Sequence, residues 1–182
     1  MITCNLMGGL GNQLFQIFTT ISYSIKTNNP FVFLNIYKLG GGVTTIRYTY
    51  WNSFLKNLNR FLINEIPLGT MVIRENGFTY NDFPINRIMN KNIILYGYFQ
   101  SYKYFENSYI TICRMIGLEN MKKKLLDKID TNIDYLNAVS IHFRIGDYKK
   151  MQEYHPLATY NYYETALSVS YTHLTMPTKR IA

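Results

Sequence analysis

The sequence predicts an α/β fold built around a parallel sheet, and two observations support this class. The first is the opening: an apolar run at residues 2–6, a glycine-rich break, a helical pattern at residues 12–25 and a second apolar run at residues 31–34. Strand, loop, helix and strand in this order are the usual start of a parallel sheet. The second is that further apolar runs, at residues 93–96 and 138–141, are again followed by helical periodicity.

The first helix has local signals at both ends. Asn12 is expected to be its N-cap, and apolar residues then recur every three or four positions as far as Ile25. The sequence Asn28-Asn29-Pro30 is expected to end it.

The rest of the chain predicts four more helices. Apolar residues spaced like one helix face run from Trp51 to Ile63, and a second helical pattern runs from Ser101 to Gly117, a typical terminator. A charged helix is expected at residues 119–130 and a last one at residues 160–169. Residues 67–92 carry few signals.

A break near residues 132–137 predicts the domain organisation. Residues 1–136 are expected to form an N-terminal domain, and residues 137–168 to begin a second one. The string from Val169 to Thr175 is similar to translated vector or adapter sequence, and residues 172–180 have no clear period. Residues 169–182 are therefore expected to be a foreign or disordered tail.

The composition of the 182 residues excludes several classes of protein. Hydrophobic residues make up 47% and charged residues 16%, which is typical of a globular chain and not of a disordered one. No apolar run approaches the roughly 20 residues that cross a bilayer, and no basic segment precedes the first apolar run as in a secretory signal. Two cysteines form no disulfide framework. We expect a cytoplasmic protein, or one peripheral at a membrane.

The net charge of +8 indicates an anionic partner, such as nucleic acid, acidic lipid or a nucleotide diphosphate. The basic residues are scattered, and neither a zinc finger nor an RNP-type motif occurs, so nucleic acid is an alternative that rests on charge alone. The histidines His142, His155 and His173 have no paired spacing. No bound metal is therefore expected.

The loop Gly8-Gly9-Leu10-Gly11-Asn12-Gln13 is the first candidate site. A glycine loop between a strand and a helix lets backbone N–H groups approach a phosphate at the positive end of the helix. The loop lacks the Lys and Ser/Thr of a P-loop and the spacing of the dinucleotide fingerprint. The Asn12 and Gln13 amides can hydrogen-bond sugar hydroxyls or phosphate oxygens. The alternative is a tight turn between strand and helix.

Two further segments are candidates. The loop from His142 to Tyr148 follows an expected strand, and Arg144 offers a planar charged fork for phosphate, with His142 and Asp147 beside it. The alternative there is a local salt bridge near a half-buried histidine. The aromatic segment Tyr96–Ser101, followed by Tyr104-Phe105, suits a sugar, because ring faces cover C–H surfaces and an amide reads hydroxyls. Its alternative is a core strand followed by a Ser-capped helix.

Together the three segments resemble glycosyltransferase family 11, which contains the α-1,2-fucosyltransferases. Residues 8–13 match the family's Gly-Gly-Leu-Gly-Asn-Gln, and residues 97–105 match Gly-Tyr-Phe/Trp-Gln-Ser-x-x-Tyr-Phe. Residues 142–147 are similar to His-x-Arg-Arg-x-Asp. The resemblance extends to residue 168 or so, with order and spacing kept.

The resemblance implies a GT-B enzyme, in which two Rossmann-like domains face a cleft. It implies an inverting, metal-independent transfer of L-fucose from GDP-fucose to a galactose-type hydroxyl of a glycan, with no cofactor besides the donor substrate. The implied donor-binding residues are His142, Arg144, Gly9, Gly11, Asn12 and Gln13. Arg144 would grip the diphosphate and act in catalysis, Glu153 or else Asp147 would be the general base, and Tyr98 and Gln100 would contact the acceptor sugar.

The chain departs from the family pattern in two ways. Ile145 stands where the motif has its second Arg, and the later Ser-Thr-Phe-Ser-Trp-Trp-like donor segment is absent from the chain. A fucosyltransferase of another linkage is therefore one alternative, and a catalytically inert nucleotide-sugar or glycan-binding fragment is another. The acceptor glycan and the oligomeric state are left open.

Overall fold

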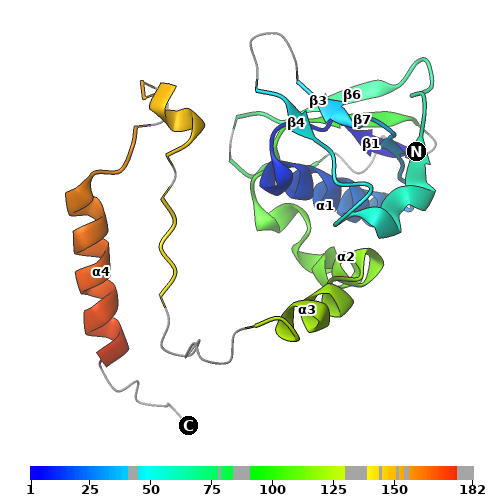
Figure 1. Ribbon diagram of the computed structural model, residues 1–182. Helices are drawn as coiled ribbons and strands as arrows, with labels where there is room; N and C mark the ends of the chain where they lie inside the picture. Colours follow the sequence, from blue (N-terminus) through cyan, green and yellow to red (C-terminus); the bar gives the residue numbers. More distant parts are fainter. Residues whose placement is uncertain are drawn as a thin grey trace. The chain divides into compact units, whose positions relative to one another are not determined.

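The computed structural model describes residues 1–40, 45–77, 79–83, 91–129, 139–143, 145–150, 152–153 and 156–175. They belong to two compact units, Met1–Asp127 and Lys128–Ala182, and each unit is described by itself (Figure 1). The predicted boundary between residues 136 and 137 lies outside the described residues and stays a prediction.

A three-stranded parallel sheet lies at the centre of the first unit, in the strand order β1-β7-β6 (Figure 1). β1 (Ile2–Cys4) pairs with β7 (Ile93–Tyr96), and β7 pairs with β6 (Met71–Arg74). The predicted strands at the chain start and at residues 93–96 are confirmed, whereas β6 falls in the region that carried few sequence signals.

A second parallel pair continues the same arrangement. β2 (Phe33–Leu34) pairs with β5 (Leu62–Ile63), and a parallel bridge between Ile2 and Phe31 connects this pair to β1. The predicted α/β class with parallel strands is thereby confirmed for the first unit, and the arrangement is compatible with a Rossmann-like fold.

The helix α1 (Leu10–Thr27) follows β1 directly, as predicted, but it begins earlier than expected. Its N-cap is Gly9, in extended conformation, and the Gln13 N–H donates to the Gly9 carbonyl at 3.0 Å. The prediction that Asn12 caps the helix is therefore wrong, because Asn12 already lies in the first turn. Asn28 ends the helix as expected, in the left-handed conformation that Asn adopts at C-caps.

The core of the first unit lies around α1. In Figure 1 the helix lies against the sheet, with α2 (Tyr109–Ile116) on its other side, and contacts of α1 with both β1 and α2 support this layering. Ile17 and Ile21 of α1 are fully buried, as are Ile2 and Ile112. Truncating such a side chain to Ala typically costs about 2–5 kcal/mol, so this layer holds the first unit together.

The helix predicted from Trp51 to Ile63 is wrong. Residues 51–55 form turns, η1 (Lys56–Phe61) is a 3-10 helix, and the last two residues belong to β5. Some of these apolar residues do contribute to the core, since Trp51, Leu55 and Leu58 are buried. Successive tight turns can also bury such apolar residues, and here they lead directly into the strand β5.

The helix predicted from Ser101 to Gly117 is broken into shorter pieces. In order these are η2 (Tyr102–Tyr104), η3 (Glu106–Ser108) and α2. The predicted end is confirmed, because Gly117 takes a φ of 75° at the C-cap of α2. The next helix, α3 (Leu118–Leu126), begins directly after it.

In the second unit the described elements are η4 (Asp147–Lys150) and α4 (Tyr160–Thr175). The buried strand predicted at residues 138–141 is wrong for residues 139–141, which pair with no described strand and are exposed; Ala138 lies outside the described residues. The helix α4 extends beyond the predicted end at Val169 as far as Thr175. The foreign origin of the tail stays a prediction.

Candidate functional site

A pocket of about 530 Å³ lies where β1 and β7 end. Its wall includes residues 5–8, which follow β1, and Tyr98, which follows β7. The carboxyl ends of parallel strands are where open α/β sheets bind ligands, and two of the three segments that the sequence singled out, the glycine loop and the segment after β7, lie at this edge.

The glycine loop is shaped by a close approach to the helix that follows it. Gly8 has a φ of 75°, and a Cβ there would lie 2.4 Å from the Asn12 side-chain nitrogen, so only glycine fits. At Gly9 and Gly11, by contrast, a Cβ would meet no described atom within 4 Å. No acidic residue lies in the first turn of α1. The helix start is therefore open and positively polarised, which favours an anion.

Gln13 has a role inside the fold. Its side chain is fully buried, and its Nε2 donates to the carbonyls of Gly8 at 3.0 Å and Tyr48 at 2.9 Å. Gln16 acts similarly, since its Oε1 accepts from the Met7 N–H at 2.9 Å. These buried amides fix the glycine loop against α1. The predicted contact of Gln13 with the donor stays a prediction.

A direct contact joins two of the predicted segments. Gln100 Nε2 donates to Asn12 Oδ1 at 2.8 Å, on the exposed side of the loop. Within the described residues, the Asn12 Nδ2 group and the Gln100 Oε1 atom have no partner, so a donor and an acceptor stay available side by side. This pairing of amides suits sugar hydroxyls.

Glu75, which the sequence reading missed, holds the segment after β7 in place. Its Oε2 accepts the N–H groups of Tyr98 at 2.7 Å and Phe99 at 2.9 Å. A Cβ at Gly97 would lie 2.4 Å from the Glu75 Cβ, so glycine is required for this approach. No local signal points to Glu75, because β6, which it follows, was not predicted.

Two basic residues on a short hairpin also line the pocket. β3 (Lys38–Leu39) pairs in antiparallel register with β4 (Arg47–Tyr48), which brings Lys38 and Arg47 to the same rim. Two cations beside an open helix start give the pocket a positive potential that favours anionic ligands. The sequence reading missed both residues, because strands of two residues leave no periodic signal.

Cys4 lies at the end of β1 but is not a nucleophile candidate. Its thiol is buried, and burial raises the pKa of Cys4 to about 12. A thiol of that kind stays protonated at neutral pH, so it packs as a small apolar side chain.

The remaining predicted residues belong to the second unit. His142 is exposed and lines a hollow of about 210 Å³ against α4 residues that include Tyr162 and Tyr163. Arg144 lies outside the described residues, Asp147 begins η4, and Glu153 is exposed in a turn. Because the two units are described separately, the roles of these residues toward the glycine loop stay predictions.

The described residues offer neither a metal-binding cluster nor a membrane-spanning helix. They contain no group of three or more His, Cys, Asp or Glu side chains arranged to hold a metal ion. None of their helices is long and apolar enough to cross a bilayer.

Comparison with known proteins identifies one distant relative. An alignment that covers 90% of this chain is 26% identical to a protein named alpha-1,2-colitosyltransferase from Escherichia coli. The chain spans 61% of the length of that relative. No protein-family model matches the chain, and no solved structure does. At this level the finding is a likeness to a glycosyltransferase.

Proposed function

We propose that this chain belongs to a glycosyltransferase that moves a deoxy-hexose from a nucleotide-sugar donor to a glycan hydroxyl. The observation that carries the proposal is the similarity to a colitosyltransferase along 90% of the chain. It agrees with the resemblance of three sequence segments to the α-1,2-fucosyltransferases.

The geometry of the first unit supports this chemistry. The pocket at the end of β1 and β7 is lined by Gly8, Tyr98 and the basic residues Lys38 and Arg47. The start of α1 and the amide pair of Asn12 and Gln100 follow Gly8 and Tyr98 closely in the chain. Positive potential favours a diphosphate, and paired amides favour sugar hydroxyls. A nucleotide sugar carries both groups.

The finer proposal is an inverting, metal-independent α-1,2-fucosyl transfer from GDP-fucose to a galactose-type hydroxyl, on a two-domain GT-B fold. Arg144 would stabilise the charge that develops on the leaving diphosphate, as preorganised donors do in other enzymes. Glu153, or else Asp147, would accept the proton of the acceptor hydroxyl. Residues 1–136 and 137–168 would be the two contributing domains.

The name of the relative favours a second donor. Colitose differs from L-fucose only in lacking the 3-hydroxyl, so GDP-colitose is the alternative donor for this site. A site that hydrogen-bonds the 3-hydroxyl would reject colitose strongly, whereas a site with an apolar contact there would accept both sugars.

The test is a transfer assay with purified chain, lactose as acceptor, and GDP-fucose or GDP-colitose as donor, in the presence of EDTA. The proposal expects a product whose mass is increased by one deoxy-hexose residue with GDP-fucose, or by one dideoxy-hexose residue with GDP-colitose. Linkage analysis of that product separates α-1,2 from other linkages. Binding of each donor, measured by calorimetry on the same sample, is the second readout.

Three outcomes distinguish the alternatives. Transfer of either sugar supports the proposal, and the donor ratio identifies which sugar is preferred. Donor binding without turnover supports the inert nucleotide-sugar-binding alternative instead. Neither binding nor transfer with either donor refutes the proposal for this chain.

A further inference from the structure

A second pocket, of about 340 Å³, lies near the other end of α1. It is formed by the last turns of α1 around Ser22 and Lys26, by residues 80–83, and by residues 103–108. Gly8, which lines the first pocket, lies just before α1, whereas Lys26, which lines this one, lies in the last turn of that helix, so the two pockets are near opposite ends of α1. Tyr104, which the sequence grouped with the sugar-binding segment, belongs to this pocket.

The wall of the pocket is aromatic. The ring centroids of Tyr80 and Tyr104 are 4.8 Å apart, those of Phe83 and Tyr104 are 5.2 Å apart, and those of Phe83 and Tyr23 are 4.8 Å apart. The corresponding planes are tilted by 59°, 37° and 45°, so the rings form a concave wall and not a parallel-sided slot for a planar base. Such a wall suits the C–H face of a pyranose ring.

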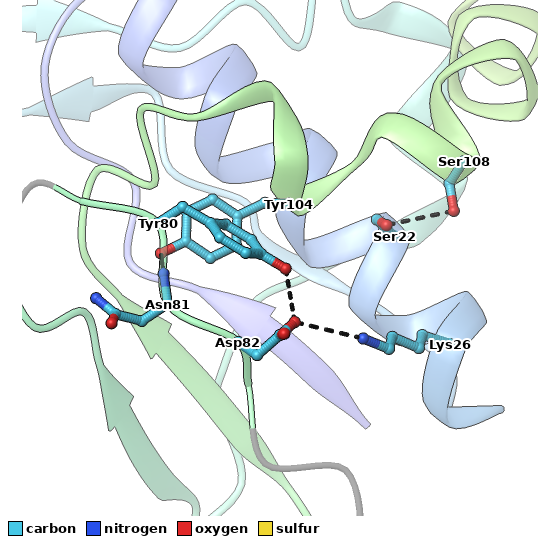
Figure 2. Close-up of polar contacts among 7 residues, drawn as sticks. All are labelled: Ser22, Lys26, Tyr80, Asn81, Asp82, Tyr104 and Ser108. Atoms are coloured by element: carbon cyan, nitrogen blue, oxygen red, sulfur yellow. Dashed lines mark hydrogen bonds and ion pairs between the residues drawn. The ribbon is translucent and has the colours of Figure 1, made fainter.

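An ion pair stands at the edge of this wall. Figure 2 shows Asp82 between Tyr80 and Lys26: the Tyr80 hydroxyl donates to Asp82 Oδ1 at 2.6 Å, and Lys26 Nζ lies 3.8 Å from the same oxygen. Both contacts use Oδ1, so within the described residues Asp82 Oδ2 is left to accept from a ligand. The Asp82 carboxylate can accept from one sugar hydroxyl, and the adjacent Lys26 ammonium group can donate to a neighbouring hydroxyl.

More polar groups with unused capacity surround the pocket. Ser22 Oγ donates to Ser108 Oγ at 3.2 Å, as Figure 2 also shows. The Asn107 side-chain amide, which also lines the pocket, has no hydrogen-bond partner among the described residues. Lys103 Nζ lies 5.8 Å from the centre of the Tyr80 ring. Several donors and acceptors therefore face the aromatic wall.

The geometry points to a binding pocket for a single neutral hexose residue of a glycan, separate from the pocket proposed for transfer. An aromatic wall with hydrogen-bonding groups at its edge is the arrangement that recognises sugars, and the volume is at the low end of the range for small-molecule sites. A second glycan site of this kind would hold a glycan chain near the enzyme. The inference stands on this pocket alone and does not depend on the proposed activity.

The experiment is saturation-transfer NMR on the full chain with D-galactose, D-glucose, N-acetyl-D-glucosamine and L-fucose as probes. Nitrogen-15 spectra of the same samples show where the sugar binds. We expect at least one hexose to receive saturation and to shift amide signals of residues 22–26, 80–83 and 103–108. The double variant Asp82→Asn/Asn107→Ala should bind at least about tenfold more weakly, because it removes the charge from one acceptor and a whole hydrogen-bonding side chain from the pocket.

Two control variants make the result decisive. Asp127→Asn removes a carboxylate at the C-cap of α3 and should leave sugar binding unchanged. Lys38→Ala alters the other pocket and should also leave it unchanged. Dispersed NMR spectra of each variant check that it is folded. If the double variant does not fold, the single variant Asn107→Ala is used in its place.

The inference is overturned if none of the four hexoses binds, or if the Asp82 and Asn107 variants bind as the unchanged chain does. It is also overturned if Lys38→Ala abolishes binding while the Asp82/Asn107 variant keeps it. In that last case the sugar occupies the pocket at the end of β1 and β7, and the proposed transfer function gains support while this inference fails.

Discussion

Replacing Glu75 should loosen the segment that carries Tyr98 and Gln100. The Glu75 carboxylate accepts two backbone N–H groups, at 2.7 and 2.9 Å. A hydrogen bond to a charged group contributes about 1.5–3 kcal/mol. Because the side chain is only half-buried, water replaces part of this energy. We expect Glu75→Ala to lower the free energy of unfolding by about 2–4 kcal/mol, and Glu75→Gln, which keeps an acceptor oxygen, by about 1 kcal/mol.

Urea unfolding followed by tryptophan fluorescence measures this effect. Trp51 is the single tryptophan of the chain and is buried in the first unit, so its emission reports on the unit that contains Glu75. Glu65→Ala is the matched control, since Glu65 is an exposed carboxylate and its removal should change stability by less than about 0.5 kcal/mol. Equal losses for Glu75→Ala and Glu65→Ala would refute the reasoning, as would a larger loss for Gln than for Ala.

Further predictions concern Gly97, Cys4 and Arg144. Gly97→Ala should cost about 1–3 kcal/mol in the same urea assay, because the new Cβ would press on Glu75, and an unchanged midpoint would contradict this. The Cys4 thiol should resist alkylation at pH 8 in folded protein and react once urea unfolds it. Since burial raises the pKa of Cys4 to about 12, stability should be unaffected below the unfolded-state pKa near 9 and should fall as pH rises from there toward 12, which urea midpoints across that range would measure. Arg144→Lys keeps the charge but loses the planar fork, so turnover in the transfer assay should drop about 100-fold, and near-normal turnover would remove Arg144 from the proposed mechanism.

The sequence predicted correctly those elements of the fold that are determined by neighbouring residues. The apolar runs gave β1 and β7, the three-to-four periodicity gave α1, and Gly117 gave the end of α2. They failed where the structure depends on distant partners. β6 is an edge strand that is mostly exposed, so its sequence shows neither a buried run nor strict alternation.

The residues of the candidate site divide in the same way, into those predicted from local sequence and those that depend on distant partners. The glycine loop and Gln100 were predicted from their residue types, and the structure brings Asn12 and Gln100 together across 88 positions. Glu75, Lys38 and Arg47 were missed, because their place at the site follows from pairing of strands and not from neighbouring residues. Asn12 was assigned as a cap because Asn favours that position, but Gly9 takes it, since the extended glycine lets the helix begin one turn earlier.

The pairing of β1 with β7 has a consequence for synthesis of the protein. Ile2 is in register with Ile93, so β1 is hydrogen-bonded to a strand that leaves the ribosome about ninety residues later. At about 5–20 residues per second, that delay is on the order of 5–20 s. During this time β1 has no pairing partner on that side, and an unpaired apolar strand edge is prone to aggregate. Slower translation before codon 93 should therefore raise the fraction that aggregates.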